Sequence, residues 1–186
     1  MQFGAAKMPS VLDQSQFCER ISDDDWSAGD TGTAATHVET LTNGPSVSRR
    51  SIYPFLDGHL IIEDRDPLPH WLPEAIRSLD ELGCLPPNWD SYGADSIRHS
   101  SILATIELLL AVMRDATPLP SFVPTSRRTV LLEWHMRGLD LEVEVRAPGR
   151  LHVVFEDSCN GIEWESELTS DLTRLVDCIA QLTANC

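Results

Sequence analysis

Apolar residues alternate with polar ones through two neighbouring segments, and this pattern constrains the fold more than any other feature of the chain. A period of two residues is typical of a strand with one buried face. The apolar positions are Val130, Leu132, Trp134 and Met136, then Leu139, Leu141, Val143 and Val145. Both sets lie on one face only if Arg137-Gly138 is a two-residue turn that pairs Met136 with Leu139. The sequence therefore predicts an antiparallel hairpin of defined register.

The next turn must have a different length. A two-residue Pro148-Gly149 loop would place Val145 opposite His152 and mix the two faces. A three-residue loop over 147–149 instead aligns Val145 with Leu151 and Val143 with Val153. We therefore expect the three-residue loop, with Gly149 left-handed as a bulge.

A fourth strand follows after a four-residue loop over 157–160. In this register Ile162 and Trp164 lie opposite Phe155 and Val153, respectively. The four strands together form an antiparallel meander, with one face packed against helices and the other in water.

Three helices are expected around this sheet. Pro73 suits the first turn of a helix that ends at Gly83, and Ser96 can cap a second helix that ends before Pro118. A third helix is expected to start at Thr169 or Ser170. Their apolar stripes are Ile76, Leu79 and Leu82; Ile102, Leu103, Ile106, Leu109, Leu110 and Met113; and Leu172, Leu175, Val176, Ile179 and Leu182. The predicted fold class is α+β, a four-stranded antiparallel β-meander packed against two or three helices.

Residues 1–50 differ in composition from the rest of the chain. Ser, Thr, Asp and Gly dominate, and Asp23-Asp24-Asp25 and Asn43-Gly44-Pro45 interrupt any periodicity. Such a segment buries too little apolar surface to offset its ordering entropy, so we interpret 1–50 as a flexible acidic N-terminal arm. Phe17, Ile21 and Trp26 can form a short docking segment within it. Residues 51–186 are interpreted as a single α+β domain that begins with a short hairpin, Tyr53-Pro54-Phe55 and Leu60-Ile61-Ile62.

The charge balance limits the classes of partner. Fourteen Lys and Arg against 29 Asp and Glu give a formal net charge of −15, and no basic cluster exceeds Arg49-Arg50 or Arg127-Arg128. Proteins that grip phosphates need a basic patch, so direct nucleic-acid binding and anionic membrane surfaces are disfavoured. No signal peptide or membrane span is apparent, and five scattered cysteines favour reduced thiols. We expect a cytoplasmic protein with a basic protein partner, and the oligomeric state stays open.

The polar face of the predicted meander collects carboxylates and imidazoles. The candidate partner-binding residues are Glu133, His135, Glu142, Glu144 and His152, together with Trp26 of the arm. The predicted register places Glu133 across from Glu142, which is unfavourable, and Glu144 across from His152, which is favourable. A divalent metal also suits carboxylates grouped with imidazoles, and an ordinary solvated strand face is the more frequent explanation. We assign no metal ligand and no cofactor.

A second constellation is the loop over 85–94, LPPNWDSYGA, between the first two helices. Its candidate residues are Asn88, Trp89, Asp90, Tyr92 and Gly93. Loops on a rigid scaffold often carry binding residues, and Asp90 would serve as a general base or a ligand contact. The structural alternative has Trp89 and Tyr92 filling the core, Asp90 accepting backbone N–H groups and Gly93 in a conformation closed to other residues. A lone Asp defines no reaction, so no catalytic residue is assigned.

These motifs resemble a family of small uncharacterised bacterial proteins. The loop 88–94 matches an NWD-[SG]-YGA motif, and a helix, a proline at Pro124, an LEW strand (132–134) and an LEIEV-like strand (141–145) follow in the same order. Val143 stands where the commoner residue is Ile. The resemblance covers roughly Leu79 to Leu182 and implies a bacterial cytoplasmic protein, with no activity to carry over.

Two classes of function fit these observations. The first is a non-enzymatic interaction module or accessory subunit, antitoxin-like, immunity-like or mimicking nucleic acid, whose acidic surface binds a basic partner. The alternative is a small ligand-binding or hydrolytic domain that uses the Asn88–Ala94 loop and requires a concave pocket there. A third, structural role would use exposed sheet edges, although Glu163 and Glu165 discourage open-ended pairing.

Overall fold

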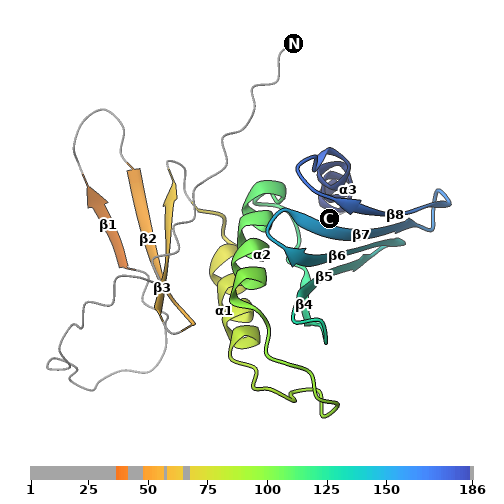
Figure 1. Ribbon diagram of the computed structural model, residues 1–186. Coiled ribbons are helices and arrows are strands. Elements are labelled where there is room, and N and C mark those ends of the chain that lie inside the picture. The colour runs from red at the N-terminus through yellow and green to blue at the C-terminus, as the bar shows by residue number, and fades with distance from the viewer. Residues whose placement is uncertain (1–36, 42–47, 57, 65–67, 185–186) are drawn as a thin grey trace, which may run out of the picture. The chain divides into compact units, whose positions relative to one another are not determined.

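The structure is a computed structural model that describes residues 37–41, 48–56, 58–64 and 68–184 (Figure 1). The chain divides into two compact units, Met1–Pro67 and Leu68–Cys186. Trp26, Phe17 and Ile21 lie outside the described residues, as does most of the segment interpreted as a flexible arm. Within 1–50 the structure describes 37–41 and 48–50, and both stretches are strand.

The first unit contains a three-stranded antiparallel sheet, ordered β1-β2-β3. The strands are β1 (His37–Leu41), β2 (Ser48–Phe55) and β3 (Gly58–Asp64). The predicted hairpin is confirmed as β2 and β3, since Phe55 pairs with Gly58 across the turn. Tyr53 and Leu60 lie directly opposite each other, and both side chains are buried.

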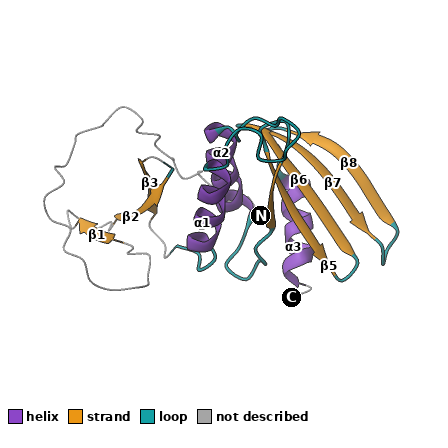
Figure 2. Ribbon diagram, turned by 90° about the horizontal axis from the view of Figure 1, so that it is seen from below, coloured by secondary structure: helices purple, strands orange, loops and turns teal. Residues whose placement is uncertain are grey.

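The second unit is an α+β fold with three helices and a five-stranded antiparallel meander (Figure 2). Its helices are α1 (Leu72–Gly83), α2 (His99–Val112) and α3 (Thr173–Ala184). Its strands, in both chain and sheet order, are β4 (Ser121–Pro124), β5 (Val130–Met136), β6 (Leu139–Ala147), β7 (Arg150–Asp157) and β8 (Ile162–Leu168).

The prediction of four strands is wrong by one, because β4 adds an edge strand beside β5. Its sequence, Ser-Phe-Val-Pro, is too short to show alternation. A tight loop brings it back: the Thr125 N–H donates to the Thr129 carbonyl at 3.0 Å, and Pro124 thereby pairs with Val130. Tertiary pairing rather than local pattern makes this strand.

The central hairpin has the predicted register. Met136 pairs with Leu139, and the turn residues Arg137 and Gly138 both have positive φ, 48° and 83°. These angles belong to the turn class whose twist matches the flanking strands. As a result Leu132 and Val143 lie opposite each other on the buried face.

At the following turn the predicted pairing is confirmed, but the bulge lies at a different residue from the predicted Gly149. Val145 pairs with Leu151 and Val143 with Val153, as expected, and Gly149 is left-handed at φ 67°. Ala147 nevertheless pairs with Arg150, and the register shift falls at Arg146. The loop is therefore two residues long, and the extra residue is Arg146 on β6. Its side chain turns to carboxylates on the polar face, which accounts for the position of the bulge.

The register of the last hairpin differs from the prediction by two residues. Trp164 pairs with Phe155, Ile162 pairs with Asp157, and Val153 faces Ser166. The Asp157 carboxylate is buried and accepts the backbone N–H groups of Cys159 and Asn160 and the Asn160 side-chain amide. Asp157 thus stays in the strand, and the loop shifts to 158–161.

The three predicted helices are confirmed, although two of them begin later than expected. Ser96 does not cap α2: the residue before its first turn is Arg98, which makes no side-chain cap. The third helix begins at Thr173, whose N–H donates to the Asp171 carboxylate at 3.0 Å. Asp171 is the better acceptor at this end, which explains the start after Thr169 and Ser170.

The core lies between the inner face of the meander and the helices (Figure 2). Helix α2 packs on β5 and β6, and Trp134 donates its indole N–H to the Pro118 carbonyl at 2.8 Å. Helix α3 approaches the sheet near β8, with the Arg174 guanidinium 3.8 Å from the Trp164 ring centre. Of the described cysteines, Cys178 is buried and Cys84 and Cys159 are exposed. Burial raises the pKa of the Cys178 thiol to about 11, so it stays protonated.

We predict that Gly138→Ala destabilises the second unit by about 1–3 kcal/mol, because φ at this turn is strained for any Cβ residue. The new Cβ would also lie 3.0 Å from Cys159 Sγ. Urea unfolding of the variant checks the expected loss. The double variant Gly138→Ala/Cys159→Ala removes the contact with Sγ and should recover only part of the lost stability. Wild-type stability of Gly138→Ala would contradict the assigned turn.

Candidate functional site

The strongest candidate site is the outer face of the second unit's sheet, the face opposite α2 and α3. The sequence-predicted residues Glu133, His135, Glu142, Glu144 and His152 all lie on it, on β5, β6 and β7. Glu133 is directly opposite Glu142, and Glu144 is directly opposite His152, as the predicted register required. The sheet therefore brings together five side chains that span twenty residues of sequence.

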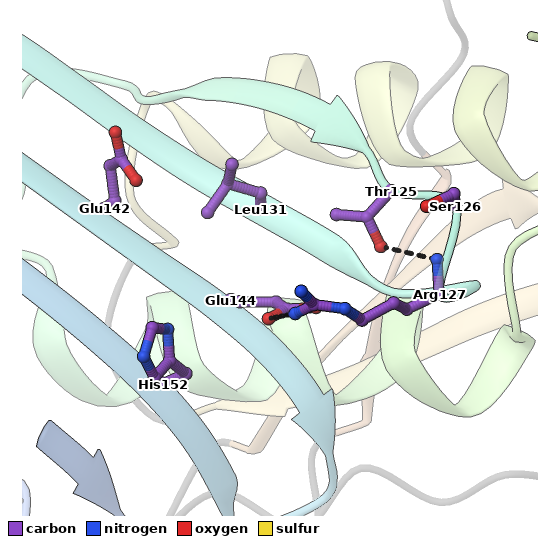
Figure 3. Close-up of a pocket in the computed structure, with 7 residues that line it drawn as sticks. All are labelled: Thr125, Ser126, Arg127, Leu131, Glu142, Glu144 and His152. Atoms are coloured by element: carbon purple, nitrogen blue, oxygen red, sulfur yellow. Dashed lines mark hydrogen bonds and ion pairs between the residues drawn. The ribbon is translucent and has the colours of Figure 1, made fainter.

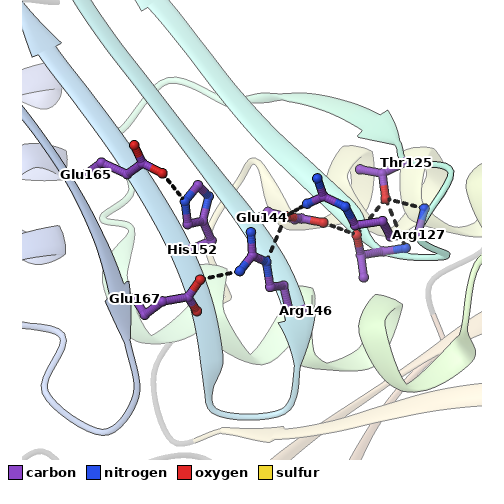
Figure 4. Close-up of polar contacts among 8 residues, drawn as sticks. Thr125, Arg127, Glu144, Arg146, His152, Glu165 and Glu167 are labelled. Atoms are coloured by element: carbon purple, nitrogen blue, oxygen red, sulfur yellow. Dashed lines mark hydrogen bonds and ion pairs between the residues drawn. The ribbon is translucent and has the colours of Figure 1, made fainter.

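Glu144 is the buried centre of one end of this face. Only 5 % of the residue is exposed. Its Oε1 accepts the Thr129 hydroxyl at 2.7 Å, and its Oε2 accepts Arg127 Nη1 and Arg146 Nε, each at 2.9 Å (Figure 4). Two guanidinium groups and a hydroxyl thus satisfy both carboxylate oxygens, as a buried charge requires.

The loop between β4 and β5 builds the rest of this network. Since the Thr129 hydroxyl donates to Glu144, the Thr125 hydroxyl donates to Thr129 Oγ1, 2.6 Å away. Thr125 Oγ1 in turn accepts the backbone N–H groups of Arg127 and Thr129. This chain of hydrogen bonds closes the loop and places Arg127 over the sheet. Sequence reasoning missed Arg127, Thr129 and Arg146, and the Thr125–Thr129 spacing is the one signal that could have pointed to the loop.

Two expectations for this end of the face are corrected. Glu144 is not a solvated strand residue, because Arg127 and Arg146 cover it. It also does not bond His152: His152 Nε2 lies 2.6 Å from Glu165 Oε1 on β8 instead (Figure 4). The two guanidinium groups carry permanent charge and occupy Glu144 Oε2.

Opposing effects act on the pKa of Glu144. Burial raises it, while the hydrogen bonds from Thr129 and Arg146 and the positive charges of Arg127 and Arg146 lower it. The second group prevails, and the pKa of Glu144 lies below its usual value. The ionised form is therefore the one that the fold stabilises.

A small pocket of about 300 Å³ opens beside this network (Figure 3). Leu131 is half-buried in its wall, and carboxylates, hydroxyls and an imidazole supply the polar groups. The lining residues are Thr125, Ser126, Arg127, Leu131, Glu142, Glu144 and His152.

The other end of the face is acidic. We call Glu133, Asp140, Glu142, Glu156 and Glu163 the acidic cluster. Its members meet across neighbouring strands: Glu133 faces Glu142, while Asp140 faces Glu156, which also faces Glu163. All of these side chains are half-buried or exposed.

His135 is the imidazole within the acidic cluster. Its Nδ1 lies 2.6 Å from Asp140 Oδ1, and its Nε2 lies 3.9 Å from Glu133 Oε2. The hydrogen bond with Asp140 and the nearby carboxylates raise the pKa of His135 above its usual value. The imidazole therefore gains positive charge at a higher pH than a free histidine does.

The Asn88–Ala94 loop has its polar groups turned on its own backbone. Asp90 Oδ1 accepts the N–H groups of Tyr92 and Ala94 at 2.8 and 3.0 Å, and Asn88 Oδ1 accepts that of Gly93 at 2.8 Å. These bonds, from Ala94 and Tyr92 above all, lower the pKa of Asp90. Gly93 has φ 92°, as the structural alternative expected.

The aromatic residues of this loop do not fill the core. Tyr92 is 94 % exposed, and Trp89 is half-buried with its indole N–H donated to the Asp95 carbonyl at 3.2 Å. The structural alternative is thus right about Asp90 and Gly93 and wrong about Trp89 and Tyr92, which do not fill the core. The ligand-binding interpretation of the loop stays a prediction.

The described residues can also be compared with the requirements of a metal site and of a membrane-spanning helix. Among those residues, no three His, Cys, Asp or Glu side chains converge as metal ligands would. None of the described helices combines the length and the apolar character that crossing a membrane demands.

Comparison of the chain with protein-family models, with curated proteins and with solved structures gives no match.

We predict that Glu144→Gln lowers the free energy of unfolding at pH 7 by about 2 kcal/mol, because charged hydrogen bonds are lost. The pKa of Glu144 is lower in the folded protein than its usual value of 4.5. The ionised carboxylate therefore stabilises the fold fully at pH values above 4.5, and this stabilisation is lost as the pH falls through the folded-state pKa. Urea unfolding from pH 7 to pH 3 should show the two proteins converging. Glu142→Gln, its half-exposed neighbour on β6, is the control and should change stability by less than about 0.5 kcal/mol. A pH-independent difference would contradict the assignment.

We also predict that Asp90→Ala speeds hydrogen exchange at the Tyr92 and Ala94 amides, because both lose their acceptor. Asp90→Asn keeps a side-chain oxygen and should preserve most of the protection. Exchange measured by NMR checks both variants. Equal protection in Asp90→Ala and the wild type would contradict the backbone-bonding role.

Proposed function

We propose that this chain is a protein-interaction module that binds a basic protein through the outer face of β5–β8. The observation that carries the proposal is the direct opposition of carboxylates in the acidic cluster. Like charges opposite each other destabilise a sheet. A partner's cations placed between the opposed carboxylates would remove this repulsion. Relief of the repulsion would then contribute favourably to the free energy of binding.

The charges on the face are divided unequally between its two ends. Arg127 and Arg146 neutralise Glu144 and Glu167 at the end near the β4–β5 loop. At the other end, the basic side chains among the described residues are the titratable His135 and the exposed turn residue Arg137, against the five carboxylates of the acidic cluster. A partner's basic residues are therefore attracted to the acidic cluster and not evenly over the sheet.

The net charge of −15 extends this attraction over a longer range. A strongly negative protein speeds its encounter with a basic partner and repels acidic surfaces. An antitoxin-like, an immunity-like or a nucleic-acid-mimicking protein would use such a surface, and the opposed carboxylates concentrate negative charge on this face.

We predict that a basic protein co-purifies with the tagged full chain from its source organism at low salt and dissociates at roughly 0.5 M salt, where exposed charges are screened. The double variant Glu142→Lys/Glu156→Lys should lose the partner. Glu107→Lys/Asp177→Lys makes the same change of net charge on α2 and α3 and should retain it.

Two results would contradict the proposal. One is equal retention by both double variants, which would mean that the face has no special role. The other is recovery of the chain alone at both salt concentrations.

A further inference from the structure

The two edges of the five-stranded sheet differ in their capacity to accept another strand. β4 has four residues and ends at Pro124, and proline has no N–H to donate. β8 has seven residues, contains no proline, and pairs on one side with β7; no other described strand lies on its second side. An unpaired edge of this length offers backbone donors and acceptors to an added strand.

The side chains of β8 match one kind of added strand. Glu163, Glu165 and Glu167 occupy alternate positions and project from the outer face, and all three are exposed. Glu165 also contacts His152 and Glu167 contacts Arg146, so an added cation would share these two carboxylates, whereas Glu163 faces another carboxylate, Glu156. Since side chains alternate with a period of two residues, an extended segment with Arg or Lys at every second position would place one cation beside each carboxylate. Ile162, at the start of the opposite face, is 51 % exposed and can contact an apolar residue of that segment.

Other occupants of this edge are opposed by charge. A second copy paired through its own β8 would place glutamates against glutamates on the same face. The N-terminal segment of this chain carries Asp23-Asp24-Asp25, which brings like charge as well. A basic segment is the occupant that the edge favours.

We propose that the basic partner contributes an extended segment that adds to β8 as a sixth strand of the sheet, with its basic side chains over Glu163, Glu165 and Glu167. This inference rests on the proposed function, because it specifies how the same partner is held. Backbone hydrogen bonds supply the geometry of the contact, and the alternating carboxylates select the sequence.

A synthetic peptide as long as β8, with Arg at every second position and Thr between, tests the strand addition on the full chain. Two N-methylated forms keep the charges but each block one edge of the peptide, one methylated at the Arg residues and the other at the Thr residues. When the Arg side chains lie over the glutamates, only one edge of the peptide backbone faces β8. The peptide methylated on that edge should bind about tenfold or more weakly than the parent, and the peptide methylated on the other edge should bind like the parent.

Hydrogen exchange supplies a second readout, since alternate β8 amides should become protected when the parent peptide binds. The variant Glu163→Lys should weaken peptide binding severalfold, while Glu107→Lys on α2 makes the same charge change and should not. Lys at position 163 would face Glu156, so the fold tolerates the change.

Several outcomes would overturn the strand addition. They are no binding of the parent peptide, equal affinities of the two methylated peptides, and no protection of β8 amides. Sedimentation of the chain alone as a dimer with protected β8 amides would identify a second copy as the occupant instead. If the peptides show no edge preference but Glu142→Lys/Glu156→Lys still loses the co-purified protein, face binding stands and the strand addition falls. If the peptides show the edge preference but Glu142→Lys/Glu156→Lys keeps the co-purified protein, the strand addition stands and binding through the acidic cluster falls.

Discussion

The pairing of Met136 with Leu139 across the Arg137-Gly138 turn determines which face of the sheet is buried. A slip of β6 by one residue against β5 would turn the apolar side chains of β6 towards water while those of β5 stay buried. With this pairing in place, Leu132 and Val143 meet under α2, and the carboxylates of the same strands share the opposite face. The core and the candidate site are thus two consequences of one register.

The outer face has two ends with different physical properties. At one end, Glu144 is buried with a full set of donors, and the β4–β5 loop and β6 are joined through it. At the other end, the carboxylates of the acidic cluster face one another and are half-buried or exposed. The first end stabilises the unit, and the second leaves negative charge available to a partner.

The parts of the fold predicted correctly are those encoded by long periodic patterns, such as the pairings of β5 with β6 and of β6 with β7. The errors fall where one polar side chain selects among similar local structures. Asp157 holds the last loop one residue later than expected, and Arg146 takes the bulge because carboxylates attract it. For the site, sequence reasoning found the face and missed Arg127, since its contact with Glu144 spans seventeen residues of chain.

The sequence by itself determined the α+β class, the central hairpin and the grouping of carboxylates on one face, because strand periodicity and turn chemistry are local properties. Only the tertiary structure decided that β4 joins the sheet, that Glu144 is buried while Glu142 on the same strand is half-buried, and that the Tyr92 side chain is exposed. These outcomes depend on which groups meet across strands and loops. Which charged side chains pair with each other depends on their distance and burial, and a periodic sequence pattern specifies neither quantity.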